Sequence, residues 1–126
     1  MAPDHALAAR SDLLPADLLQ HAAILPSHDT FTRRIIDGLL APDEGRLDII
    51  LETNYLETIK VMASANLGWS ILPRNMADEG LTCIPLSGLA ARRRLGAVTR
   101  RNRTLSPGSN AMLELLRENA DAPPAS

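Results

Sequence analysis

The chain has 126 residues, of which 45% are hydrophobic, 22% are charged and 2% are aromatic, so its length fits one compact domain with an aliphatic core. Its formal net charge of -2 lacks the positive excess that a protein needs to bind a phosphate backbone. A single cysteine, Cys83, excludes an internal disulfide and fits a reducing compartment, and we expect it to pack within a strand.

Residues 1–10 contain no apolar core of signal-peptide length. The longest strongly apolar run, residues 49–51, is far shorter than the roughly 20 residues of a membrane span. These features predict a cytoplasmic protein that has no contact with a membrane.

The first half of the chain predicts helices and strands in alternation. Residues 15–19 resemble a helical turn with proline at its first position, and the apolar run at 22–25 predicts a strand. Residues 31–40 predict a helix whose apolar stripe leaves Arg33, Arg34 and Asp37 outside it, and Pro42 is expected to end this helix. Either Asp29 or Thr30 is expected to cap its start.

A second strand and helix are predicted next. Residues 47–51 predict the strand, and Asn54 and Glu57 have the N-cap and N3 spacing of a capping box. The helix that starts there is expected to end near Asn66 or Gly68, because both residue types accept the left-handed backbone conformation.

The second half predicts three more strands and one more full helix. The strands are expected at 69–72, 81–84 and 95–98, with a helical turn at 74–79. Ser106 as N-cap and Pro107 at the first position predict a last helix, with an apolar face made by Met112, Leu113, Leu115 and Leu116. Strands that alternate with amphipathic helices predict an α/β fold with a mainly parallel sheet flanked by helices.

The chain offers few residues for catalysis, metals or nucleotides. The histidines His5, His21 and His28 lack ligand spacing with one another and with Cys83, so we predict no metal site. Glycines occur singly, without the spacing of a nucleotide-binding loop, and no nucleophile elbow is present, so we predict no cofactor. A small α/β enzyme that uses His28 and Asp29 is a low-ranked alternative to polar loop residues beside a helix start.

The polar residues that follow the first two strands form the more informative group. Open parallel sheets bind ligands beyond the carboxyl ends of their strands, which here are residues 26–32 and 52–55. Hydroxyls, helix N-terminal N–H groups and the aromatic residues Phe31 and Tyr55 suit a small anionic ligand. The alternative is that Asn54 and Asp29 or Thr30 only cap helices while both aromatic rings pack on the sheet.

A basic cluster surrounds the predicted strand at 95–98 and consists of Arg92, Arg93, Arg94, Arg100, Arg101 and Arg103. It is compatible with nucleic acid binding. Because no aromatic residues are interleaved for base stacking, we favour a solvated, charged edge.

Several segments resemble LysR-type transcriptional regulators. Residues 4–8, 14–18 and Thr32-Arg33 at a helix start follow the order seen in that family. The clearest segment is residues 52–73, which is similar to the family's helix, turn and strand that end in proline. The similarity continues through residues 95–98 and 105–107, so it covers nearly the whole chain. Asn66 stands where the family usually has glycine, and we expect Asn66 to accept the left-handed conformation.

This resemblance implies a co-inducer-binding domain similar to type 2 periplasmic binding proteins, with one subdomain and part of a second. We expect a connector at 1–21, effector subdomain II at 22–91, a return segment of an incomplete subdomain I at 92–119, and a disordered tail at 120–126. The family's DNA-binding helix-turn-helix would precede Met1, so DNA would be reached only through a domain that this chain lacks. Family members form homo-oligomers, but a truncated subdomain I argues against extending that property to this fragment.

By the same resemblance, five residues correspond to positions that line the family's effector cleft: Ser27, Thr30, Phe31, Thr32 and Tyr55. The implied partner is a small, anionic metabolite, and no catalytic residue or enzymatic activity is expected. The rival interpretations are a transport-type solute-binding protein, which the lack of an export signal disfavours, and a truncated, non-functional remnant.

Overall fold

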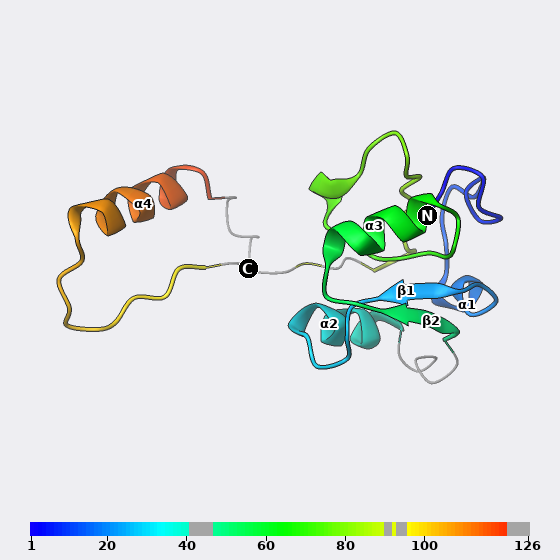
Figure 1. Cartoon of the computed structure of the whole chain (residues 1–126), viewed down its shortest axis with the longest axis horizontal. Coiled ribbons are helices and arrows are strands. Elements are labelled where there is room, and N and C mark those ends of the chain that lie inside the picture. Colours follow the sequence, from blue (N-terminus) through cyan, green and yellow to red (C-terminus); the bar gives the residue numbers. More distant parts are fainter. Residues whose placement is uncertain (41–46, 90–91, 93–95, 121–126) are drawn as a thin grey trace. The chain divides into compact units, whose positions relative to one another are not determined.

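The computed structural model describes residues 1–40, 47–89, 92 and 96–120. The helices and strands in chain order are α1 (Pro15–Leu18), β1 (Ala23–Leu25), α2 (Phe31–Leu40), β2 (Ile49–Glu52), α3 (Leu56–Ser64), the 3₁₀ helix η2 (Arg74–Met76) and α4 (Pro107–Glu118) (Figure 1). The chain divides into two compact units, Met1–Arg93 and Arg94–Ser126. We describe each unit by itself.

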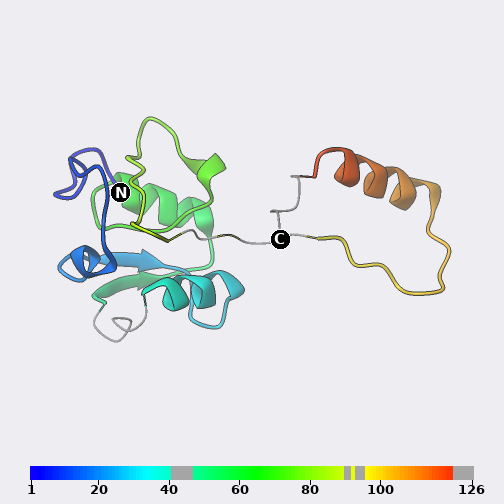
Figure 2. The same ribbon diagram turned by 180° about the vertical axis from the view of Figure 1, so that it is seen from behind.

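The first unit is built on a parallel pair of strands. β1 pairs with β2 so that Ala23 lies opposite Ile49, Ile24 opposite Leu51 and Leu25 opposite Glu52. Helix α2 lies in the connection between the two strands, and helix α3 packs against β1. Figures 1 and 2 show α2 on the side of β2, away from α3. Both strands therefore end at the same edge of the sheet, as parallel pairing requires.

The core of this unit is aliphatic and centres on β1 and Trp69. All three residues of β1 are fully buried, and the core cluster consists of Leu7, Leu13, Leu18, Ala23, Leu25, Ile36, Leu40 and Trp69. The indole N–H of Trp69 donates to the carbonyl oxygens of Leu18 at 3.2 Å and His21 at 3.0 Å. Because these bonds satisfy its only polar atom, Trp69 lies in the core without the cost of an unpaired N–H.

A close backbone approach brings Trp69 to β1. The Trp69 N–H donates to the Ala22 oxygen, and the Ile24 N–H donates to the Trp69 oxygen, both at 2.9 Å. A Cβ added to Gly68 would lie 2.4 Å from that Ala22 oxygen, so this crossing requires glycine. Asn66 adopts the left-handed conformation with φ of 60° after α3, which confirms the prediction for this residue.

The three later strands were predicted wrongly. Among the described residues, β1 and β2 are the assigned strands, and residues 69–72 contribute one isolated bridge between Trp69 and Ala23. Residues 81–84 are irregular, because the backbone groups near them bond to the start of the chain, which itself forms no strand. The Thr82 N–H donates to the Met1 oxygen, and the Leu13 N–H donates to the Pro85 oxygen. Residues 96–98 form no strand, and Leu95 lies outside the described residues.

Two smaller expectations also change. Cys83 is exposed and is not packed within a strand. The turn predicted at 74–79 is shorter, since η2 covers Arg74–Met76. The expected end of α2 at Pro42 and residues 121–126 of the expected tail lie outside the described residues.

In the second unit, α4 begins as the sequence predicts. Ser106 is its N-cap, Pro107 follows at the first position, and the Ser106 hydroxyl accepts from the Ser109 N–H at 3.2 Å. The apolar side chains of Met112, Leu115 and Leu116 are at least half exposed. In the part of the chain that the structure describes, no helix has the length and apolar character to cross a membrane.

Candidate functional site

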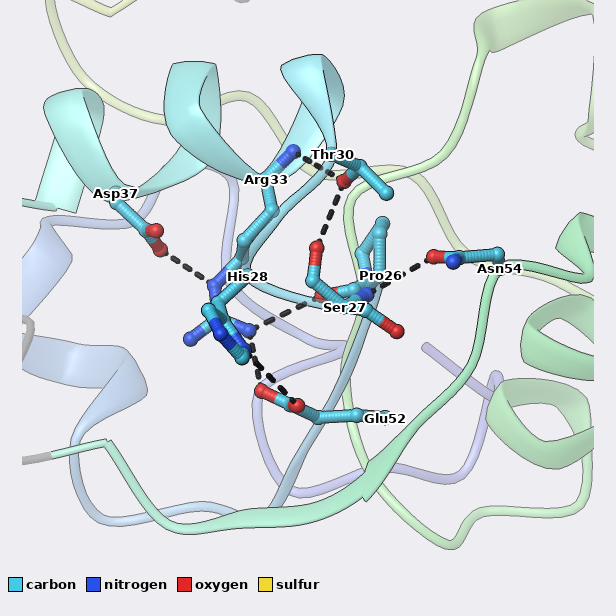
Figure 3. A network of polar contacts seen from close by, with 8 residues as sticks. All are labelled: Pro26, Ser27, His28, Thr30, Arg33, Asp37, Glu52 and Asn54. Atoms are coloured by element: carbon cyan, nitrogen blue, oxygen red, sulfur yellow. Dashed lines mark hydrogen bonds and ion pairs between the residues drawn. The ribbon is translucent and has the colours of Figure 1, made fainter.

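The candidate site lies where β1 and β2 end. Residues 26–30, which we call the β1–α2 turn, follow β1, and residues 53–55 follow β2. The Asn54 Oδ1 accepts from the Ser27 N–H at 3.1 Å and so joins these two segments (Figure 3). The parallel pairing thus brings Ser27 beside the segment that holds Tyr55, although the two are 28 positions apart.

Thr30 caps α2. Its hydroxyl accepts from the Arg33 N–H at 3.1 Å and donates to the Ser27 oxygen at 2.8 Å. The Thr30 N–H donates to the same oxygen at 3.0 Å, which closes the turn. Thr30, and not Asp29, therefore makes the capping bond, and Phe31 and Thr32 become the first two residues of α2.

The capping box predicted from Asn54 and Glu57 is wrong. The N-cap of α3 is Tyr55, which makes no side-chain capping bond, and Glu57 is the second residue of the helix. The Asn54 side chain is engaged by the Ser27 N–H across the strand pair. The Asn54 Oδ1, which local spacing predicted as the cap of α3, therefore accepts a hydrogen bond from a distant part of the chain instead.

The two aromatic rings at the site are exposed. Phe31 is 57% exposed and Tyr55 is 77% exposed, so neither packs on the sheet as the structural alternative predicted. The Arg34 guanidinium carbon lies 5.9 Å from the centre of the Phe31 ring. Exposed rings beside helix starts can offer contact area to a ligand, because each has an apolar face.

Beneath the turn lies Arg33, which is only 5% exposed. Its Nη1 donates to the Glu52 Oε1 at 2.6 Å and to the Pro26 oxygen at 3.0 Å, and its Nε donates to the Asp37 Oδ1 at 2.5 Å (Figure 3). The sequence places Arg33 outside the apolar stripe of α2, and the structure shows that this side chain is nevertheless buried. The signals that could have revealed it are the i,i+4 spacing to Asp37 and an acidic residue at the end of the neighbouring strand.

These contacts shift two pKa values. The hydrogen bond from Arg33 is the main cause that lowers the pKa of Glu52 below its ordinary value. Burial acts to lower the pKa of Arg33, but hydrogen bonds to Glu52 and Asp37 outweigh it, and the pKa is raised. Both groups are charged at neutral pH at their ordinary pKa values, and the two shifts move each pKa farther from neutrality, so the site contains an ion pair.

The structure pairs His28 with Glu52. The His28 Nδ1 lies 3.9 Å from the Glu52 Oε2, and its side chain is 81% exposed. The geometry thus offers no support for the low-ranked enzyme built on His28 and Asp29. Among the described residues, no group of three or more His, Cys, Asp or Glu side chains is placed to hold a metal ion.

The sequence profile of the LysR substrate binding domain matches residues 1–121 of this chain. The chain belongs to this family. It is 29% identical over 123 residues to the uncharacterized HTH-type transcriptional regulator YfeR of Shigella flexneri, and 29% identical over 117 residues to the uncharacterized HTH-type transcriptional regulator YbhD of Escherichia coli (strain K12). The alignments cover 94% and 90% of this chain but 40% and 37% of the two relatives.

The match confirms the resemblance to LysR-type regulators that the sequence indicated. The LysR family consists of transcriptional regulators, and its substrate binding domain implies a fold like that of periplasmic binding proteins. The small parallel sheet with its helices agrees with part of such a fold.

The basic cluster is exposed where the structure describes it. Arg92, Arg100, Arg101 and Arg103 all face solvent, whereas Arg93 and Arg94 lie outside the described residues. This exposure agrees with a solvated, charged segment, and no strand forms there among the described residues.

Proposed function

We propose that this chain is the effector-sensing part of a LysR-type regulator, which binds a small anionic metabolite at the edge formed by Ser27, Thr30, Phe31, Thr32 and Tyr55. The observation that carries this proposal is the hydrogen bond between the Ser27 N–H and Asn54. It joins the ends of two parallel strands, which is where sheets of this class bind ligands.

The chemistry of this edge suits a carboxylate. Helices α2 and α3 both begin there, and the positive ends of their dipoles, each equivalent to about half an elementary charge, favour an anion. The Ser27 hydroxyl offers a further donor, and the exposed rings of Phe31 and Tyr55 offer apolar contact. A small carboxylate with an apolar body satisfies all of these groups.

The proposed action is a shift between two arrangements of the regulator, without any bond made or broken. An effector that binds one arrangement more tightly raises its population. We assign residues 22–91 to effector subdomain II, with residues 1–21 as its connector, and residues 92–119 to a segment of subdomain I. In the regulator as a whole, a helix-turn-helix domain would contact DNA in the cytoplasm, and homo-oligomers would transmit the shift.

A thermal-shift screen tests the proposal directly. Acetate, succinate and benzoate serve as probes, and at least one is expected to raise the melting temperature of the chain. A ligand at 100 times its Kd stabilises a protein by about 2.7 kcal/mol, which gives a shift of roughly ten degrees in a domain of this size.

Variants locate the binding site. Phe31→Ala and Tyr55→Ala are expected to weaken the binding of the stabilising probe, because both rings are exposed and their loss leaves the core intact. Val61→Ala is the matched control, since Val61 is 59% exposed on α3, within the helix rather than at its start. If no probe raises the melting temperature, or if all three variants bind like the parent, the proposal is contradicted.

A further inference from the structure

One residue holds both ends of the β1–α2 turn. The Arg33 N–H donates to the Thr30 hydroxyl at the end of the turn, and the Arg33 Nη1 donates to the Pro26 oxygen at its start. Figure 3 shows the guanidinium beneath the turn, with the backbone nitrogen at the start of α2. The turn is therefore bracketed by the main chain and the side chain of a single residue.

The same guanidinium ties the turn to the neighbouring strand. Its Nη1 reaches the carboxylate of Glu52, the last residue of β2, and its Nε reaches Asp37 one helical turn farther along α2. The planar fork of arginine can meet acceptors in several fixed directions, which the compact ammonium of lysine cannot reproduce. One side chain thus links the β1–α2 turn, the end of β2 and helix α2.

The ion pair between Arg33 and Glu52 is a weak means of stabilising the fold, because burial of the guanidinium costs free energy while water screens the partly exposed carboxylate. The acceptors of Arg33 are not spread over the core: two of them lie at the carboxyl ends of the strands, beside Ser27 and Asn54. Its contacts therefore point to a role in the geometry of this edge.

We propose that Arg33 is a positioning residue of the effector site, which sets the spacing of the β1–α2 turn from the end of β2. The inference rests on the proposed function. At 5% exposure Arg33 has little surface for an effector to contact, so it acts on an effector through the turn that it holds.

Hydrogen exchange on the full chain tests this role without any ligand. In Arg33→Lys two amides are expected to exchange about tenfold faster: that of Ser27, which is bonded to Asn54, and that of Thr30, which is bonded within the turn. The amide of Ile24 donates to the Trp69 oxygen and the amide of Ile59 donates within α3 to the Tyr55 oxygen, and both are expected to keep the rates of the parent. Arg34→Lys is the matched control, because it makes the same change at the next, exposed position and is expected to alter none of these rates.

Two results of this exchange experiment would overturn the inference. Unchanged rates at Ser27 and Thr30 would show that Arg33 does not hold the turn, and an equal acceleration of all four amides would show a general effect on stability. If Arg33→Lys does not fold, the triple variant Arg33→Gln, Asp37→Asn, Glu52→Gln answers the same question, because it leaves no unpaired carboxylate at Asp37 or Glu52. The same local acceleration at Ser27 and Thr30 is expected there.

A calorimetric titration with benzoate separates this inference from the proposed function. Where the parent binds benzoate, Arg33→Lys is expected to bind about tenfold more weakly. Arg10→Lys, at an exposed arginine that pairs with Asp17 before the site begins, is expected to bind as tightly as the parent. Equal affinities in all three proteins would overturn the positioning role. Where the parent binds no carboxylate, the proposed function fails, and the exchange rates at Ser27 and Thr30 still decide whether Arg33 holds the turn.

Discussion

At the scale of single residues, Glu52 joins the electrostatics of the site to its geometry. Its carboxylate accepts from Arg33 at 2.6 Å and lies 3.9 Å from His28, while its side chain remains 37% exposed. Water therefore screens part of the attraction, and the ion pair contributes less than a fully buried pair would. Glu52 is thus a point at which pH acts on the fold.

We predict that Glu52→Gln lowers the free energy of unfolding by about 1 kcal/mol or less at pH 7, and that this difference disappears in acid. Arg33 lowers the pKa of Glu52 in the folded state, so its contribution is complete above the unfolded pKa of about 4.5 and is lost as pH falls through the lower folded value. Urea unfolding of the parent and the variant from pH 7 to pH 3, followed by Trp69 fluorescence, measures this difference in the free energy of unfolding. The exposed Glu79→Gln serves as control, and a difference that persists at pH 3 would disprove the assignment.

At the scale of elements, two of the three longer helices begin with a hydroxyl cap and the third begins without a side-chain cap. Thr30 caps α2, Ser106 caps α4, and α3 starts at Tyr55 without a side-chain cap. The Ser106 cap was predicted because it depends only on neighbouring residues. The cap of α3 was mispredicted because Asn54 bonds to Ser27 on the other strand connection.

Because α4 has no buried residues among those described, its cap should carry an unusually large share of its stability. Ser106→Ala removes the acceptor for the Ser109 N–H and is expected to cost the helix about 1 kcal/mol. Carbon chemical shifts of residues 107–112 are expected to move toward coil values. Ser106→Asp, which restores an N-cap oxygen, should keep the shifts of the parent, and equal shifts in all three proteins would contradict this role for the cap.

The strands were predicted from local apolar runs, and only some of these runs form strands in the structure. Residues 22–25 and 47–51 were correctly predicted as strands, within one or two residues at each end. Residues 69–72 and 81–84 have the same apolar character but lack a full ladder of backbone partners among the described residues. An apolar run becomes a strand only where a neighbour can accept its hydrogen bonds.

At the scale of the whole molecule, the two units differ in how much they bury. The first unit contains the aliphatic cluster around β1 and Trp69, whereas the described residues of the second include none that is buried. Its apolar side chains, such as Val98 at 99% exposure, face solvent. Local opening should therefore cost much less free energy in the second unit.

We predict that amides of residues 111–118 exchange on the order of a hundredfold faster than those of β1 and the last turn of α3. Hydrogen exchange followed by mass spectrometry on the intact chain measures this ratio. Each amide rate is referred to its own unfolded-chain value, which serves as the internal control. Uniform protection across both units would contradict this prediction, because it would show that the apolar face of α4 is buried in solution.

The sequence by itself determined most of the helices, the two paired strands and the aliphatic core, because these depend on spacing and composition along neighbouring residues. The resemblance of several segments to LysR-type regulators indicated the family, which the profile match confirms. It also selected Ser27 and Thr30, which lie together in the β1–α2 turn. Only the tertiary structure decided that Asn54 bonds to Ser27, that Phe31 and Tyr55 are exposed, and that Arg33 is buried under the turn. Each of these depends on which strand ends meet, and parallel pairing joins residues that are far apart in the chain.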